Sequence, residues 1–154
     1  MAPTFEKEMI VEFSETDMAG IVHFTQFFRY AERTEHAFLR SLGMSVVDGH
    51  SGDADGNRHG WPRVHASFDY VAPLRFEQTF RVVLGVERLG ERSVHYLFRV
   101  ESDRAVHGIG KISAAYVRFD AVTKKVKGVA VPANFREAIS CLTEQDRDNF
   151  LSTR

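Results

Sequence analysis

The sequence predicts an α+β domain in which one helix packs on one face of an antiparallel sheet. Three features indicate this class: one long amphipathic segment near the N-terminus, several alternating apolar segments after it, and no β-α-β pattern that would signal a parallel sheet. The chain has 154 residues, 44% of them hydrophobic, which fits a single domain that spans residues 1–154 and buries a core.

The first elements are expected before residue 43. Residues 8–13 alternate between apolar and polar side chains, which predicts a strand, and residues 14–20 form a loop. Apolar side chains then recur at helical spacing over residues 25–42, and Gly43 is a suitable residue to end that helix. The helix is expected to have about five turns at ~3.6 residues per turn.

The remaining segments are mostly strands. Residues 48–60 are rich in Gly and Asp, which predicts a mobile loop. Alternating patterns predict strands over residues 64–70, 80–86, 94–100 and 105–120. A short helix is expected from Pro132 to about Leu142, followed by a further helical turn capped by Thr143.

The composition argues against several classes of function. A formal net charge of −1 is unlike that of a nucleic-acid or membrane-surface binder, so neither partner is expected. The sequence shows no apolar run near the ~20 residues of a membrane span and no signal-peptide pattern. Cys141 is the single cysteine, so an internal disulfide is excluded and a cytoplasmic protein is the simplest expectation.

One acidic residue stands where acyl-group chemistry would need it. Asp17 lies in a Gly-containing loop that leads directly into the long helix. A helix N-terminus offers unpaired N–H groups and partial positive charge, which stabilise a developing oxyanion. A carboxylate beside it can attack a carbonyl or activate a water molecule.

The motif around Asp17 resembles a known family. Residues 13–24 have the sequence FSETDMAGIVHF, residues 27–30 FFRY, residues 69–76 DYVAPLRF and residues 131–136 VPANFR. These segments resemble the hotdog-fold acyl-CoA thioesterases of the 4-hydroxybenzoyl-CoA thioesterase type. The resemblance implies a long central helix wrapped by a five-stranded antiparallel sheet, and hydrolysis of an acyl-CoA thioester without a cofactor.

The resemblance also implies roles for the residues of the loop. Asp17 would be the nucleophile or the general base, so a covalent anhydride and base-assisted attack by water both stay open. The N–H of Phe24 would polarise the thioester carbonyl, and Gly20 would let that carbonyl approach. His23 would orient water or substrate, or would simply be a polar residue at the helix entry.

The CoA phosphates require cations near the surface. Arg88 and Arg92 flank an expected hairpin turn, where this family tends to place such residues, and Lys111 is a third candidate. Each could equally be an ordinary solvated charge.

Glu32 is more often a surface residue, although it could face a partner's site. Where the family often has Asn-Tyr, this chain has Gln26 and Phe27, so the resemblance does not carry over a role that rests on that Asn or that phenol.

The acyl group and the assembly are less constrained. Residues 64–69 and the Gln26-Phe27 pair are similar to the dihydroxynaphthoyl-CoA hydrolase branch, which favours an aromatic acyl group slightly over an aliphatic one. An acyl-carrier-protein substrate also stays open. An apolar sheet face and an edge strand need cover, so a homodimer or homotetramer is expected. The resemblance implies that the site lies at the subunit interface.

Other chemistries find weaker support. His50, Asp53, Asp55 and His59 lack the spacing of a zinc or calcium site, so no metal is expected. Cys141 is predicted to be a packing residue, and a Gly-x-Ser-x-Gly elbow does not occur. Two rivals to hydrolysis are a hotdog dehydratase, which needs an Asp–His pair of another motif, and a non-catalytic acyl-binding protein.

Overall fold

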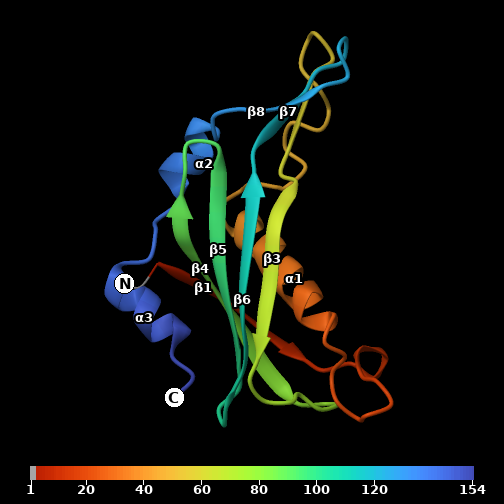
Figure 1. Cartoon of the computed structure of the whole chain (residues 1–154), viewed down its shortest axis with the longest axis vertical. Helices are drawn as coiled ribbons and strands as arrows, with labels where there is room; N and C mark the ends of the chain where they lie inside the picture. The colour runs from red at the N-terminus through yellow and green to blue at the C-terminus, as the bar shows by residue number, and fades with distance from the viewer. Residues whose placement is uncertain (1–2) are drawn as a thin grey trace.

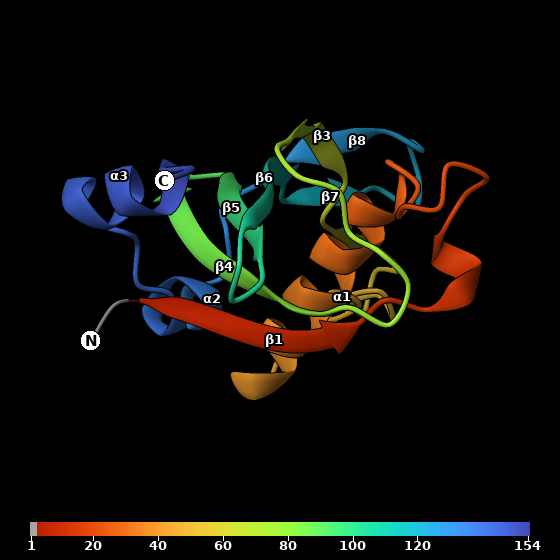
Figure 2. The same cartoon turned by 90° about the horizontal axis from the view of Figure 1, so that it is seen from below.

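The computed structural model describes residues 3–154. Its main sheet has five antiparallel strands in the order β1-β4-β5-β6-β3, and helix α1 lies against one face of it (Figures 1 and 2). The α+β class and the five-stranded antiparallel sheet are therefore confirmed. The expected long central helix is not seen, because α1 has 16 residues (Gln26–Ser41), with Thr25 at its N-cap and Gly43, at a φ of 72°, just beyond its end.

Over residues 3–154, the elements are two sheets, three α-helices and one short 3-10 helix. The main sheet contains β1 (Thr4–Ile10), β3 (Arg63–Tyr70), β4 (Thr79–Leu89), β5 (Ser93–Glu101) and β6 (Val106–Ala115). A second sheet of order β2-β7-β8 contains β2 (Arg58–Gly60), β7 (Val117–Phe119) and β8 (Val126–Gly128). The helices are η1 (Phe13–Glu15), α1, α2 (Ala133–Ala138) and α3 (Glu144–Leu151). Figure 1 shows the small sheet projecting beyond one end of the main sheet.

Two predicted strands have different bounds. The first ends at Ile10 and not at residue 13, because residues 13–15 turn into η1, where the Glu12 N–H donates to Oε1 of Glu15 at 2.9 Å. The strand predicted over 105–120 is two strands, because the chain bends at Tyr116, whose N–H donates to the Arg92 carbonyl at 2.8 Å. This bend directs β7 out of the main sheet and into the small one.

The segment 48–60 is only partly a loop. Its last three residues form β2, and Asn57 is buried. The N–H of Asn57 donates to Oδ1 of Asp53 at 3.0 Å, and its own Oδ1 accepts from the N–H of Ala121 at 3.0 Å. The segment is therefore tied to the turn between β7 and β8, and its mobility stays a prediction.

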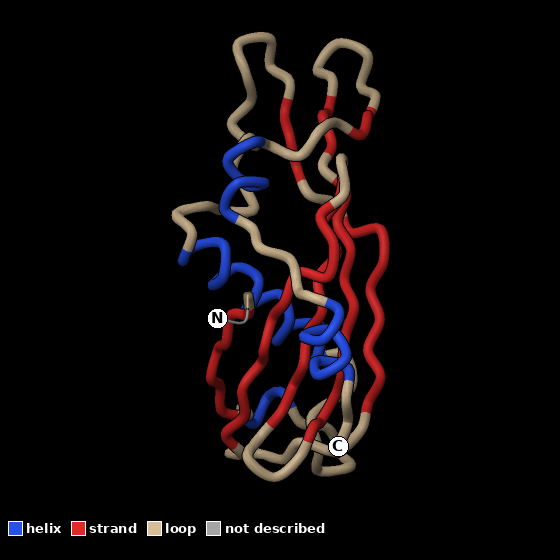
Figure 3. Tube along the Cα trace, turned by 90° about the vertical axis from the view of Figure 1, so that its left-hand side faces the viewer, coloured by secondary structure: helices blue, strands red, loops and turns tan. Residues whose placement is uncertain are grey.

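Strand alternation divides the sheet into two packed faces. The face toward α1 is formed by Val82, Leu84 and Val86 of β4 and by Tyr96, Phe98 and Val100 of β5. The opposite face carries Val83 and Leu97, which pack with Phe150 of α3. In Figure 3, α1 and α3 accordingly lie on opposite sides of the strands.

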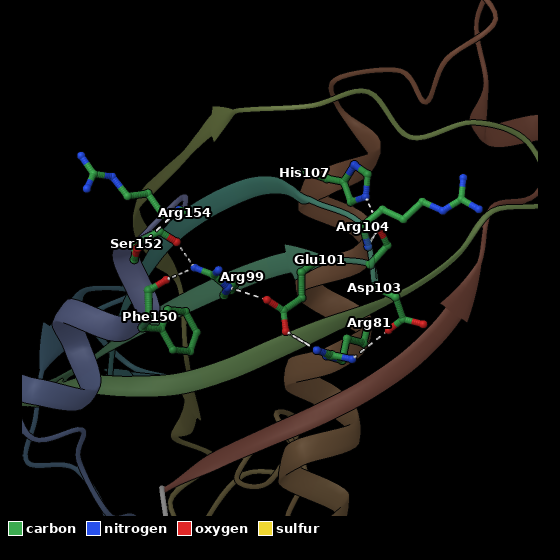
Figure 4. Close-up of polar contacts among 10 residues, drawn as sticks. Arg81, Arg99, Glu101, Asp103, Arg104, His107, Phe150, Ser152 and Arg154 are labelled. Carbon is green, nitrogen blue, oxygen red and sulfur yellow. Dashed lines mark hydrogen bonds and ion pairs between the residues drawn. The ribbon is translucent and has the colours of Figure 1, made fainter.

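Polar contacts fasten the C-terminal segment to the sheet. The guanidinium of Arg99 donates to the carbonyls of Phe150 and Ser152, and Glu101 bridges Arg99 and Arg81 (Figure 4). This arrangement holds the end of α3 over β5.

The C-terminal helices partly follow the prediction. Thr143 caps α3 as expected, since its Oγ1 accepts from the N–H of Asp146 at 3.1 Å. Helix α2 ends at Ala138, so Cys141 lies outside it and is exposed; the expectation of a packing cysteine was wrong. Within residues 3–154, the helices are too short or too polar to cross a membrane.

Candidate functional site

The loop that carries Asp17 is a tight, hydrogen-bonded turn. The Asp17 N–H donates to the Ile21 carbonyl, and the Gly20 N–H donates to the Asp17 carbonyl, both at 3.0 Å. Oδ1 of Asp17 accepts from the Ala19 N–H at 2.8 Å, whereas its Oδ2 has no hydrogen-bond donor within residues 3–154. Asp17 is exposed, so one carboxylate oxygen is held by the turn and the other is accessible.

The glycine in this turn has a backbone role. Gly20 has a φ of 78°, which L-residues with a side chain rarely adopt. A Cβ at this position would meet nothing within 4 Å. Glycine is therefore required here by the backbone conformation and not by steric crowding.

A buried acid anchors the loop to α1. The carboxylate of Glu15 accepts from the Tyr30 hydroxyl at 3.0 Å and from Nη1 of Arg33 at 3.0 Å, and its carbonyl accepts from the His23 N–H at 2.9 Å. Burial, and then the charge of Glu15, raise the pKa of Tyr30. Sequence reasoning missed Glu15; a signal was available in Tyr30 and Arg33, which lie three residues apart and thus on one helix face.

Only one of the two polar backbone groups of Phe24 is hydrogen-bonded within the described residues. Its carbonyl accepts from the Tyr70 hydroxyl at 2.9 Å, while its N–H has no acceptor within the described chain. The Tyr70 ring also meets the rings of Phe24 and Phe27 edge-on, with centroids 6.5 and 5.0 Å apart. Tyr70 is a second residue that sequence reasoning did not single out, and burial raises the pKa of its hydroxyl.

Asp17 and Phe24 border the same apolar groove. This groove has a volume of about 510 Å³ and is lined by Asp17, Ile21, Val22, Phe24, Phe27, Tyr70 and the segment 71–74. A second groove of about 530 Å³ is lined by Phe13, Thr16, Asp17, Met18, Gly20 and Phe76. Asp17 therefore lines both grooves, and Phe24 lines the first of them.

His23 is turned away from Asp17. Its Nδ1 lies 2.7 Å from Oγ1 of Thr25 and accepts from the Thr25 N–H at 3.3 Å, and its ring packs on Phe24 at 4.6 Å. Of the predicted loop residues, the structure thus brings Asp17, Gly20 and Phe24 together around the grooves, while the side chain of His23 contacts the helix entry.

One of the candidate CoA ligands, Arg88, lies far along the sheet from the groove within one chain. Arg88 lies near the far end of β4, an 11-residue strand whose start is near the groove. At ~3.3 Å per residue, Arg88 is roughly 30 Å from that start. Arg88 contacts Nε2 of His95 at 2.8 Å, and burial, followed by the charge of Arg88, lowers the pKa of His95. Lys111 lies 3.9 Å from Glu87, and Arg92 is the last residue of the β4–β5 turn. Their role in binding CoA stays a prediction.

Other sequence candidates stay apart from the site. Glu32 is exposed on α1, as expected of a surface residue. The segment 48–60 borders a different cavity of about 240 Å³, beside Leu39 and Trp61. Within residues 3–154, no three His, Cys, Asp or Glu side chains are arranged to hold a metal ion.

Comparisons with known proteins agree with this geometry. The thioesterase-like superfamily model matches residues 11–139. A 1,4-dihydroxy-2-naphthoyl-CoA hydrolase of Prochlorococcus marinus (strain MIT 9313) is 30% identical over 105 residues, which cover 65% of this chain and 70% of that protein.

Solved structures are similar over most of the chain. A hypothetical protein from Aquifex aeolicus superposes with a TM-score of 0.74 at 26% identity and covers 88% of this chain and 99% of its own. A 1,4-dihydroxy-2-naphthoyl-CoA thioesterase from Synechocystis superposes with a TM-score of 0.73 at 24% identity, over 88% of this chain and 95% of its own, which shows a shared fold. The chain therefore belongs to the thioesterase-like superfamily of hotdog proteins, as its motifs predicted.

Proposed function

We propose that the protein is an acyl-CoA thioester hydrolase that releases a free acid and CoA. Family membership and the CoA hydrolases among its relatives support this activity. The observation that carries the proposal is that one apolar groove is lined by both Asp17, whose Oδ2 accepts no hydrogen bond within residues 3–154, and Phe24, whose N–H has no acceptor there. Acyl transfer needs these two groups beside a bound carbonyl.

The chemistry follows from that pair. The thioester oxygen accepts a hydrogen bond from the Phe24 N–H, which stabilises the negative charge that develops on it. The carboxylate of Asp17 either attacks the carbonyl carbon or removes a proton from a water molecule that attacks. The C–S bond then breaks, and CoA leaves as a thiolate that needs no strong general acid. In the covalent route, water subsequently hydrolyses the acyl–aspartyl anhydride and restores Asp17.

The groove favours an aromatic acyl group. Phe24, Phe27 and Tyr70 line it and contact one another edge-on, and aromatic rings interact favourably with one another. Relatives named for 1,4-dihydroxy-2-naphthoyl-CoA support the same class of substrate.

The site is completed in a dimer through β3. This strand is at the edge of the main sheet and most of its residues are exposed, including Val64 at 63% and Tyr70 at 47%. Two antiparallel β3 strands related by a two-fold axis would join the sheets and satisfy the open edges. The start of each β3 would then lie next to the end of its partner, beside the partner's groove.

The test is a thiol-release assay over a panel of thioesters. Aromatic acyl-CoAs should be hydrolysed with the highest kcat/KM, followed by short and medium aliphatic ones, with acyl-carrier-protein thioesters assayed in parallel. Tight acyl-CoA binding without thiol release would instead identify a non-catalytic binding protein. A hydrated or dehydrated acyl-CoA product with the thioester intact would identify a dehydratase.

A further inference from the structure

The chain that leads into α1 has one free backbone donor. Between residues 22 and 26, four N–H groups donate hydrogen bonds at 2.8–3.3 Å, namely those of Val22, His23, Thr25 and Gln26. The N–H of Phe24 is the exception, because it has no acceptor within residues 3–154. Phe24 lines the groove together with Asp17, and its N–H is the donor assigned above to the thioester oxygen.

Hydrogen bonds hold the peptide groups on both sides of Phe24. The carbonyl of His23, which shares a peptide group with the Phe24 N–H, accepts from the Gln26 N–H at 2.9 Å. The next peptide group carries the Phe24 carbonyl, which accepts from the Tyr70 hydroxyl at 2.9 Å. Because each peptide group is planar, the two bonds together limit rotation about both backbone bonds of the Phe24 Cα. They thereby fix the direction of the free N–H.

The bond from Tyr70 differs from the others in its origin. The bonds to the His23 carbonyl and from the Thr25 N–H join residues of the same short segment. Tyr70 lies on β3, 46 residues away along the chain. Among the residues that the structure describes, its hydroxyl makes the one hydrogen bond from the main sheet to the peptide groups between residues 23 and 26. Tyr70 therefore fixes this segment relative to the sheet.

The side chain of Tyr70 is itself held in place. Its backbone pairs with Gly108 of β6, and its ring meets the buried ring of Phe27 edge-on at 5.0 Å. It also lies nearly parallel to the ring of Phe68, with centroids 6.4 Å apart. Burial raises the pKa of Tyr70, so its hydroxyl keeps its proton near neutral pH and acts as a donor.

The ring contacts of Tyr70 do not explain its hydroxyl. A phenylalanine would make the same contacts with Phe27 and Phe68, so the oxygen needs a separate explanation. Tyr70 is 47% exposed, and a hydroxyl near the surface can bond to water at little cost. Here it bonds instead to Phe24, the residue that carries the free N–H.

We propose that the hydroxyl of Tyr70 is a positioning group for thioester hydrolysis, which holds the peptide groups of Phe24 so that the free N–H donates to the thioester oxygen. The inference rests on the proposed hydrolase function and adds a residue of β3 to the groups that serve it. The hydroxyl acts through Phe24 and not on the reacting atoms. An oxyanion donor is effective because it is oriented before the charge develops, so a loosened donor stabilises the transition state less.

Removal of the hydroxyl alone tests this role. Tyr70→Phe keeps the ring that lines the groove, and it should lower kcat for the best acyl-CoA of the panel by about 10–100-fold. That is less than the ~10²–10³-fold effect of deleting an oxyanion donor outright. KM should change by less than about twofold, because ground-state binding is retained. An unchanged kcat would overturn the proposal, and so would a rise in KM at unchanged kcat, since Tyr70 would then bind substrate directly.

Tyr116→Phe is the matched control. Tyr116 is a buried tyrosine that borders a different cavity, beside Trp61, and its variant should keep the kcat and KM of wild type. Equal losses in the two variants would contradict a specific role of the Tyr70 hydroxyl. Tyr70→Phe should also sediment as wild type does. A fall in kcat that accompanies subunit dissociation would assign Tyr70 to the subunit interface and overturn the proposal.

The carbonyl of a bound thioester reports on the donor directly. Its infrared C=O stretch moves to lower frequency when the oxygen accepts a hydrogen bond. An acyl-CoA with carbon-13 in the thioester carbonyl is bound to Asp17→Asn, in which turnover is slow. The added Tyr70→Phe change should move the stretch to higher frequency, whereas added Tyr116→Phe should not. An identical stretch with and without the Tyr70 hydroxyl would refute the positioning role.

A fluorinated tyrosine at position 70 replaces Tyr70→Phe if that variant does not fold. Fluorine lowers the pKa of the phenol, and a phenolate cannot donate to the Phe24 carbonyl. The kcat should therefore fall at a lower pH than in wild type, and an unshifted pH profile would contradict the proposal.

The positioning role and the proposed function fail separately. If wild type binds acyl-CoA without releasing thiol, the proposed function fails, and the infrared comparison still decides whether Tyr70 orients the Phe24 N–H. If wild type hydrolyses the thioester and Tyr70→Phe does so equally well, only the positioning role fails.

Discussion

Two carboxylates, two residues apart, have opposite environments. Glu15 is buried and accepts hydrogen bonds from Tyr30 and Arg33, whereas Asp17 is exposed and keeps one oxygen accessible. A fully bonded buried acid stabilises structure, and an accessible one can react. The motif identified Asp17. Glu15 escaped prediction because its partners are 15 and 18 residues away, so the only sequence signal was their shared helix face and not a pattern around Glu15.

Glu15→Gln should weaken both the fold and turnover. The change removes the ion pair with Arg33 and should lower the free energy of unfolding by about 1.5–3 kcal/mol, the range for a hydrogen bond to a charged group. It should also lower kcat, because the loop that positions Asp17 loses its anchor. Glu32→Gln, which removes an exposed acid from the same helix, is the control for denaturant unfolding and kinetics. Equal stability of the two variants would refute the anchoring role.

Gly20→Ala tests the backbone explanation of that glycine. At a φ of 78° the substitution should cost about 1–2 kcal/mol of unfolding free energy, although the new methyl group meets no neighbour. Gly20→Asn should cost less, since Asn adopts the left-handed region more readily. Thermal unfolding of both variants measures the difference, and an Asn variant less stable than the Ala variant would contradict the backbone explanation.

Among the elements, those with long local patterns were predictable. The alternation over residues 80–86 and 94–100 and the turn between them correctly indicated β4 and β5. The three-residue strands β2 and β8 escaped prediction because each is defined by pairing with β7, and β2 lies far from β7 in sequence. The break at Tyr116 likewise depends on a hydrogen bond to the distant Arg92.

Asn57→Ala should loosen the small sheet. The side chain is buried and accepts from the N–H of Ala121, so its removal leaves that donor without this partner. The expected loss is about 1–3 kcal/mol of unfolding free energy, with faster amide exchange at Ala121. Asp55→Ala, at an exposed position of the same loop, should behave as wild type. Amide exchange at Ala121 that is as slow in the Asn57→Ala variant as in wild type would show that Asn57 does not hold the segment 48–60 to the β7–β8 turn.

The ion pair between Glu35 of α1 and Arg63 of β3 should make the stability of the fold depend on pH. Burial raises the pKa of Glu35, and its partner Arg63, at 2.8 Å, opposes that rise. A folded pKa above the unfolded value means that the native state binds the proton more tightly. This contribution to stability is therefore complete below the unfolded pKa, near 4.5, and is lost as pH rises through the folded pKa.

The Glu35→Gln variant tests the predicted direction of this pH dependence. The difference in unfolding free energy between wild type and variant should decrease as pH rises above about 4.5, measured by denaturant titrations at fixed salt. A difference that grows with pH would mean that Arg63 lowers the pKa more than burial raises it.

The whole molecule is proposed to work as a dimer. The Asp17 loop, the start of α1 and the end of β3 all meet at one end of an unpaired edge strand. Sedimentation at micromolar concentration should therefore show a species of at least twice the 17.5 kDa chain mass. Val64→Lys on the exposed edge should shift it toward monomer and reduce activity, whereas Val47→Lys, also at an exposed valine, should not. A wild-type protein that sediments only as a monomer would refute the shared site.

The central claim is that the carboxylate of Asp17 performs the chemistry. Asp17→Asn keeps the size of the side chain, and its amide oxygen can still accept from the Ala19 N–H, so folding and thermal stability should be close to those of wild type. Against the best acyl-CoA of the panel, kcat should fall by about 10²–10⁴-fold, the range for loss of a positioned acid–base group. Retention of full kcat by this variant would contradict the account.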